Sequence, residues 1–261
     1  MVLFPHLFER GDFIIHTYHV ALGLTAIGII LGGYFLTERM GVSKDVYINF
    51  SLITFIGGVI GWRVVFFISK IGKIIEEPSS IQWFIMWGNS FPGIMLIGGI
   101  TSLFYLSKKT DNLWRFYDEF APVVLFGYAF MKIFGCFLTG CCFGLPTDLP
   151  WGVKFPENSI AGYVFPGQKL HPVQLYEGFG GIILGFIAIF MNRFKKYYGE
   201  TSLWIPLLLS VQRFSMDFFR WRKLAVGNLS LTQFVCIIIF LVWTPILISF
   251  YLKKTHTRFH K

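Results

Sequence analysis

Charged side chains are scarce in this 261-residue chain. Asp, Glu, Lys and Arg together make up 14% of it, against about 25% in a typical soluble domain. Hydrophobic residues account for 54%, and the mean hydropathy is +0.61. This composition excludes an ordinary soluble protein and indicates a membrane protein.

The apolar residues are grouped in seven windows, each near the roughly 20 residues that a membrane-spanning helix needs. The windows cover approximately residues 14–36, 46–69, 88–107, 119–138, 174–192, 201–219 and 230–251. Because lipid offers the backbone no hydrogen-bond partners, so many spans must be helical. We therefore predict an all-α polytopic membrane protein with seven transmembrane helices, which forms a single integral membrane domain over residues 1–261.

The first window lacks the marks of a cleaved signal peptide. Acidic residues, Glu9 and Asp12, precede it, a basic n-region is missing, and no small-residue cleavage site follows it. We therefore expect this window to be a retained helix.

Lys and Arg are distributed unevenly between the two sets of loops. The loops at about 37–45, 108–118 and 193–200 and the tail at 252–261 hold twelve, whereas the opposite side holds eight. The positive-inside rule then predicts a cytoplasmic C-terminus and an N-terminus outside. Anionic lipid head groups account for the net charge of +9, so we expect no nucleic-acid partner.

The longest outer connection, residues 139–173, is rich in Pro and Gly. Such a length and composition predict a small folded cap on the periplasmic or extracellular side. The chain has no clear internal repeat and no pair of broken helices, which makes a transporter the least favoured class.

Cysteine is rare as well, and three of the four cysteines lie in the stretch GCFLTGCCFG. Cys136, Cys141 and Cys142 lack the C-x2-C spacing of zinc sites, and no His is close in sequence, so we expect no metal site. The vicinal pair is also a poor disulfide candidate. The favoured interpretation is close packing of helices and a re-entrant loop by small residues. The alternative is a thiol near the site with a steric or redox-sensitive role.

Ionisable residues interrupt the apolar windows at Arg63, Lys132, Arg213 and Asp217. Each costs about 3 kcal/mol at the middle of a helix and persists mainly where it meets water, a partner or a substrate. Arg213 and Asp217 are spaced i,i+4, and Arg220 continues their helix face. This trio is either an internal salt bridge that staples helices or an Arg-lined phosphate pocket, because guanidinium binds anionic oxygens in a bidentate manner.

Two further polar clusters open helices. The stretch LHPVQLYEG contains His171, Gln174 and Glu177, and helix capping alone would account for the last two without a binding role. The stretch IIHTYHVALG brings Tyr18 and His19 to the start of the first helix. Histidine can act as a base near neutral pH without a large pKa shift, although a lone interfacial His is more often a bystander.

Four segments, in this order and with seven spans, resemble the prolipoprotein diacylglyceryl transferases of bacterial inner membranes. They are FPHLFERGDFIIHTYHVALG, GCFLTGCCFGLPTDLPWGVKFP, HPVQLYE and RFSMDFFR, and the resemblance covers nearly the whole chain. It implies transfer of the diacylglyceryl group of phosphatidylglycerol to the lipobox cysteine thiol of a secreted preprotein, which forms a thioether and releases glycerol phosphate.

The resemblance also implies roles for single residues. Tyr18 matches the family's first-helix tyrosine, and Gly144 matches the glycine that closes the signature. Arg213 matches the essential arginine, Arg220 a further arginine, and Arg63 falls in a G-x-R pattern. The chain departs from the family at Pro92 for His or Tyr, Ile133 for Arg, Cys136 for Asn, Cys141 for Glu, Asp217 for Glu and His19 for Gly. In place of the missing arginine the chain offers Lys132, about 100° around the helix.

The reaction breaks an alkyl C–O bond with a thiolate, so the enzyme must stabilise charge on the leaving phosphate and assist loss of the thiol proton. The predicted catalytic residues are Arg213, Asp217, His171, Tyr18 and His19, with His171 or His19 as the base. The predicted lipid- and phosphate-binding residues are Arg63, Lys132, Gly144, Gln174, Glu177, Arg213 and Arg220. No metal or organic cofactor is required. The alternatives are a lipid-dependent transferase with a different acceptor and a catalytically silent lipid- or lipoprotein-binding protein.

Overall fold

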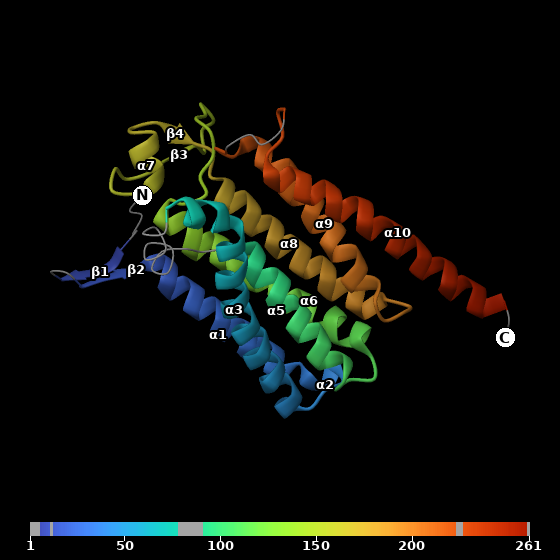
Figure 1. Cartoon of the computed structure of the whole chain (residues 1–261). Helices are drawn as coiled ribbons and strands as arrows, with labels where there is room; N and C mark the ends of the chain where they lie inside the picture. The colour runs from blue at the N-terminus through green and yellow to red at the C-terminus, as the bar shows by residue number, and fades with distance from the viewer. Residues whose placement is uncertain (1–5, 11–12, 78–90, 223–226, 260–261) are drawn as a thin grey trace. The chain divides into compact units, whose positions relative to one another are not determined.

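The structure, a computed structural model, describes residues 6–10, 13–77, 91–222 and 227–259 of the chain. Most of these residues are helical (Figure 1). In chain order the helices are α1 (Thr17–Phe35), α2 (Thr37–Met40), α3 (Lys44–Glu76), α5 (Phe91–Ser107), α6 (Leu113–Phe130), α7 (Ile160–Val164), α8 (Val173–Phe194), α9 (Glu200–Met216) and α10 (Leu231–Phe259). A π-helical stretch, η2 (Met131–Phe137), continues α6, and a 3-10 turn, η3 (Asp217–Phe219), continues α9.

Each of the seven apolar windows overlaps with one of these helices. Five helical stretches are long and apolar enough to cross a membrane, namely Thr17–Phe35, Lys44–Ile68, Leu113–Phe137, Val173–Phe194 and Leu231–Lys254. The apolar part of α5, Leu96–Ser107, and the 17-residue α9 are shorter than these. The all-α, multi-pass membrane architecture is thus confirmed, whereas the number of seven spans stays a prediction.

Large apolar side chains face outward along these helices, as a lipid-embedded protein requires. On α10, for example, Leu241 is 65% exposed and Ile238 58% exposed. Exposed apolar side chains at this density are unfavourable in water, and acyl chains are their natural surroundings.

The chain forms two compact units, one of residues 1–32 with 117–261 and one of residues 33–116. In the second unit α3 and α5 approach each other closely through glycine. A Cβ atom on Gly61 would lie 2.1 Å from the carbonyl oxygen of Gly93, and one on Gly93 would lie as close to that of Gly61. Only glycine permits this contact between the two helices.

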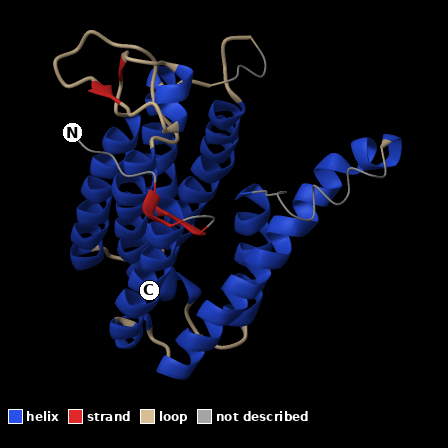
Figure 2. Ribbon diagram, turned by 90° about the vertical axis from the view of Figure 1, so that its left-hand side faces the viewer, coloured by secondary structure: helices blue, strands red, loops and turns tan. Residues whose placement is uncertain are grey.

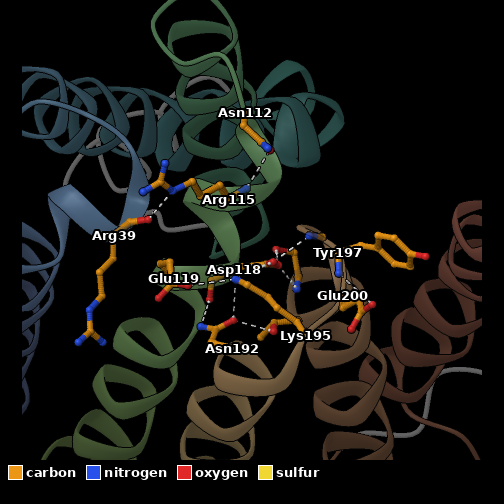
Figure 3. Close-up of polar contacts among 12 residues, drawn as sticks. Arg39, Asn112, Arg115, Asp118, Glu119, Asn192, Lys195, Tyr197 and Glu200 are labelled. Atoms are coloured by element: carbon orange, nitrogen blue, oxygen red, sulfur yellow. Dashed lines mark hydrogen bonds and ion pairs between the residues drawn. The ribbon is translucent and has the colours of Figure 1, made fainter. Parts of the chain in front are cut away.

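In the first unit α8 packs against η2 and α9, and α9 packs against α10. Figure 3 shows how the start of α6, the end of α8 and the start of α9 are joined. Asp118, which is fully buried, accepts hydrogen bonds from the backbone N–H groups of Gly199 and Ser202, each at 2.8 Å. Its carboxylate lies 3.1 Å from Lys195 Nζ, and its carbonyl accepts from Asn192. One side chain thereby caps α9 and binds it to α6 and α8.

The described residues contain two antiparallel strand pairs (Figure 2). β1 (His6–Arg10) pairs with β2 (Phe13–His16) directly before α1, and β3 (Val153–Lys154) pairs with β4 (Lys169–Leu170) within the segment 139–173. Next to this second pair lies a small core of Phe137, Phe143, Phe155, Ala161 and Leu170. The segment therefore folds around an apolar centre, and its predicted place outside the membrane stays a prediction.

Candidate functional site

A fully buried carboxylate, Glu177 near the start of α8, lies among three cations. Its Oε2 is 2.6 Å from Lys132 Nζ and 3.6 Å from Arg220 Nη2. Its Oε1 accepts a hydrogen bond from Arg213 Nη1. A buried charge without partners is strongly unfavourable, so Glu177 requires these cations as much as they require it.

The π-helical stretch η2 explains how Lys132 reaches this cluster although Ile133 stands where the family resemblance implies arginine. Ile133 packs against α8, since a Cβ atom on Gly178 would lie 2.6 Å from Ile133 Cγ1. Lys132 contacts the same helix through Glu177. A π-helical turn is wider than an α-helical turn and is often found at functional sites. Two adjacent residues of η2 therefore both contact α8.

A second carboxylate, Asp217 in η3, is 1% exposed and holds the other side of the cluster. Its Oδ1 lies 3.5 Å from Arg213 Nη2, one turn away as the spacing predicts. Its Oδ2 lies 3.2 Å from Arg222 Nη1 and accepts a hydrogen bond from Ser230 Oγ. Gln233 Oε1 also accepts from Arg222, at 2.5 Å. Asp217 thus joins the end of α9 to the start of α10.

The cluster carries more positive than negative charge. Lys132, Arg213, Arg220 and Arg222 supply four positive charges, and Glu177 and Asp217 supply two negative ones, which leaves a formal excess of two. The side chains of the four cations are 11–21% exposed, and Arg213 is the most exposed of them. An anion can therefore reach the cations whose charge the carboxylates do not balance.

Sequence reasoning missed Arg222, which it counted only as a loop charge. The available signal was its position two residues after Arg220 in RFSMDFFRWR. Its importance depends on Asp217 and on Gln233, which follows it by eleven residues. That contact could not be read from helical spacing.

Gly144 joins three segments of the site through its backbone. Its N–H donates to the carbonyl of His171 at 3.1 Å, and the residue pairs with Arg220 as an isolated β-bridge. A Cβ atom here would lie 2.5 Å from His171 and 2.8 Å from the carbonyl oxygen of Phe219. The position therefore accepts only glycine, because any side chain would separate these strands.

Neither Gln174 nor Glu177 serves as a helix cap. Gln174 is fully buried, and its Nε2 donates to the carbonyl of Cys141 at 2.7 Å. Arg220 holds the next carbonyl, that of Cys142, through Nε at 3.4 Å and Nη2 at 3.3 Å. The turn that contains these cysteines is thus attached to α8 and to the chain after α9.

His171 lies on the same framework. Its Nδ1 is 3.4 Å from Tyr176 Oη, which accepts a hydrogen bond from Trp151 Nε1 at 2.8 Å. Its ring packs against Phe219 with the ring centroids 5.2 Å apart. Partial burial lowers the pKa of His171 below its ordinary value and thereby favours the neutral imidazole.

The remaining predicted residues lie in α1 and in the second unit. Tyr18 and His19 occupy the first turn of α1, with their rings 5.9 Å apart. Tyr18 is within electrostatic range of the three cysteines of the 136–142 stretch. Arg63 belongs to the second unit, where its guanidinium lies 5.6 Å from the ring centre of Trp62. Pro92 is the second residue of α5 in that unit.

Comparison with known proteins places this arrangement in context. The family model described as prolipoprotein diacylglyceryl transferase matches residues 5–249. A phosphatidylglycerol–prolipoprotein diacylglyceryl transferase of Clostridium tetani is 31% identical over 88% of this chain and 91% of its own length. A phosphatidylglycerol–prolipoprotein diacylglyceryl transferase 2 of Clostridium perfringens is 30% identical, and a phosphatidylglycerol–prolipoprotein diacylglyceryl transferase of Campylobacter lari is 28% identical. They cover 86% and 95% of this chain, over 87% and 93% of their own lengths.

Replacing Glu177 tests its place at the centre of the cluster. Glu177→Gln leaves Lys132, Arg213 and Arg220 without their shared counter-charge, and we expect a loss of about 3–5 kcal/mol in stability. The thermal unfolding midpoint of the purified protein in detergent measures it. The matched control is Glu157→Gln, an exposed carboxylate in the 139–173 segment, which should change nothing. Equal midpoints for both variants would refute a central role for Glu177.

Proposed function

Because the chain belongs to the prolipoprotein diacylglyceryl transferase family, we propose that it transfers the diacylglyceryl group of phosphatidylglycerol to a prolipoprotein cysteine thiol. The observation that carries the proposal is the excess positive charge around Glu177 and Asp217. A lipid phosphate is the anion that a membrane supplies at such a site. Neither an alternative acceptor nor a silent binding protein is favoured, because the curated relatives carry the name of this transferase.

The reaction has a simple balance of bonds. The acceptor sulfur forms a bond to the glyceryl carbon, and the bond from that carbon to the phosphate oxygen breaks. The electron pair leaves with glycerol phosphate, and the thiol proton passes to a base. Charge develops on the phosphate oxygens, so donors fixed in advance around them lower the barrier. We assign this role to Arg213 and Arg220, with Lys132 and Arg222 adding positive charge.

We assign the role of base to His171. Its lowered pKa favours the neutral imidazole, which can accept a proton, and its carbonyl accepts a hydrogen bond from the N–H of Gly144, the residue that pairs with Arg220. His19 is the alternative, next to Tyr18 in α1. Asp217 is a poor base, because it already binds two arginines.

We also propose that the protein lies in the bacterial inner membrane with seven spans, its N-terminus outside and residues 139–173 as an outer cap. The Lys and Arg distribution supports this orientation. Alkaline phosphatase, which is active only outside the cytoplasm, should be active when fused after Asp148 and inactive when fused after Lys109. The reverse result would overturn the orientation.

Arg213→Lys separates phosphate binding from a structural ion pair. Lysine keeps the charge near Glu177 and Asp217 but loses the planar fork that binds two phosphate oxygens. We expect transfer to fall about 100-fold with little change in the unfolding midpoint. Mass spectrometry of a lipobox peptide incubated with phosphatidylglycerol measures the adduct.

The control for this variant is Arg193→Lys, an exposed arginine in the last turn of α8, which should leave transfer unchanged. A structural ion pair gives the opposite pattern: a lower midpoint for Arg213→Lys and full transfer by the protein that remains folded. That pattern would exclude the proposed role in phosphate binding.

The pH dependence of transfer tests His171. A base must be neutral to act, so the rate should fall as the pH drops through the lowered pKa of His171, and this acid limb should lie below pH 6.5. His171→Gln should lower the rate by about 100-fold and abolish the limb. His19→Gln is the matched control and should preserve it. An acid limb that survives in His171→Gln and disappears in His19→Gln would reassign the base.

A further inference from the structure

Three thiols lie close together beside the cluster of cations around Glu177 and Asp217. The sulfur atoms of Cys136, Cys141 and Cys142 lie within 4.8 Å of one another, and all three cysteines are free. Cys136 lies in η2, and the other two lie in the turn that follows it. The sequence predicted no metal site because the spacing is C-x4-C-C and not C-x2-C. The folded chain nevertheless brings three thiols together.

The backbone holds this arrangement at a cost. Cys142 has φ +60°, a left-handed conformation that a residue with a side chain rarely adopts. Arg220 and Gln174 hold the turn in place by donating to the carbonyls of Cys142 and Cys141. Conformations of this kind persist where the surroundings enforce them and are concentrated at functional sites. The thiol of Cys142 is therefore positioned by side chains that lie outside its own turn, namely Arg220 and Gln174.

The distances suit a soft metal ion. Thiolates bind Zn²⁺ at about 2.3 Å, which puts tetrahedral sulfur ligands about 3.8 Å apart. The observed sulfurs need to move by only about 1 Å to reach that spacing. Three thiolates and one dication carry a net charge of −1. Lys132, four residues before Cys136, and Arg220, bonded to the Cys142 carbonyl, supply compensating charge.

We propose that Cys136, Cys141 and Cys142 bind one Zn²⁺ ion through three thiolates and leave a fourth position for an incoming thiol. Among the described residues, Cys136, Cys141 and Cys142 are the group that could hold a metal ion at this place. Three protein ligands with one open position are the arrangement of reactive zinc sites, in contrast to closed structural ones. Cys142 is exposed, so a fourth ligand can enter from that side.

The incoming thiol is the part of the proposal that rests on the proposed function. A thiol that binds Zn²⁺ loses its proton outright and becomes a thiolate, and His171, the base assigned above, takes up that proton. The acceptor cysteine of a prolipoprotein would then be presented as a nucleophile beside Arg220. The transfer step itself is unchanged: sulfur bonds to carbon, and the phosphate leaves with the electron pair.

Metal content tests the site without any lipid or activity. The full chain is purified under reducing conditions, equilibrated with Zn²⁺ and analysed by inductively coupled plasma mass spectrometry. We expect one zinc per chain, and none in the triple variant Cys136→Ser, Cys141→Ser, Cys142→Ser. The matched control is Cys236→Ser, a buried free cysteine on α10, which should keep one zinc per chain. Zinc below one-tenth of an equivalent in the unmodified chain, or equal amounts in both variants, would overturn the site.

A single substitution at the exposed Cys142 provides a second test if the triple variant fails to fold. Cys142→Ser should keep the unfolding midpoint of the metal-free protein and weaken zinc binding at least about tenfold, since one of the three thiolate ligands is lost. Unchanged affinity in this folded variant would contradict the assignment.

The open position has its own test. Co²⁺ in place of Zn²⁺ gives sulfur-to-cobalt charge-transfer bands whose intensity reports the number of thiolates. A lipobox peptide should strengthen these bands, and the same peptide with Ser for Cys should not. If zinc binds but the two peptides act alike, the open position for a thiol is rejected. Because this readout needs no phosphatidylglycerol, it is independent of whether the transferase assignment holds.

Discussion

The buried carboxylate of Glu177 is the common partner of three cations in this membrane protein. A negative charge with no exposed surface needs positive partners within a few ångströms, and Lys132, Arg213 and Arg220 supply them from three separate segments. Asp217 repeats the arrangement at the junction of α9 and α10. The helices converge on two carboxylates, and four cations remain in a region where two would balance the charge.

Both ends of the first unit contain buried carboxylates and cations, but in different proportions. At one end Asp118 and Glu119 share a single cation, Lys195, and the backbone of α9 uses the remaining lone pairs of Asp118. At that end the described contacts of the two carboxylates go to groups of the protein itself, and they connect α6, α8 and α9. At the other end the cations outnumber the carboxylates, so the polar groups there can still bind an anion.

Local features of the sequence were sufficient for part of this arrangement. The seven apolar windows each overlap with a helix, because hydropathy is a property of short segments. The pair Arg213 and Asp217 followed from i,i+4 spacing. The central position of Glu177 did not, because its partners lie up to 45 residues away in the chain and depend on how α8 packs against η2 and α9. The π-helical turn and the approach of three thiols also leave no periodic signal, so spacing rules favoured packing for the cysteines and predicted no metal site.

The turn at Cys141 and Cys142 connects the charge cluster with the 139–173 segment. The guanidinium of Arg220 donates hydrogen bonds to the carbonyl of Cys142 and forms an ion pair with Glu177. Gly144, two residues after Cys142, pairs with the backbone of Arg220. An anion that takes up donors of Arg220 must compete with that carbonyl. Because Cys142 keeps a left-handed conformation only while its surroundings hold it, the position of the third thiol depends on the same arginine. The proposed phosphate binding and the geometry of the thiols would therefore be linked through one side chain, that of Arg220.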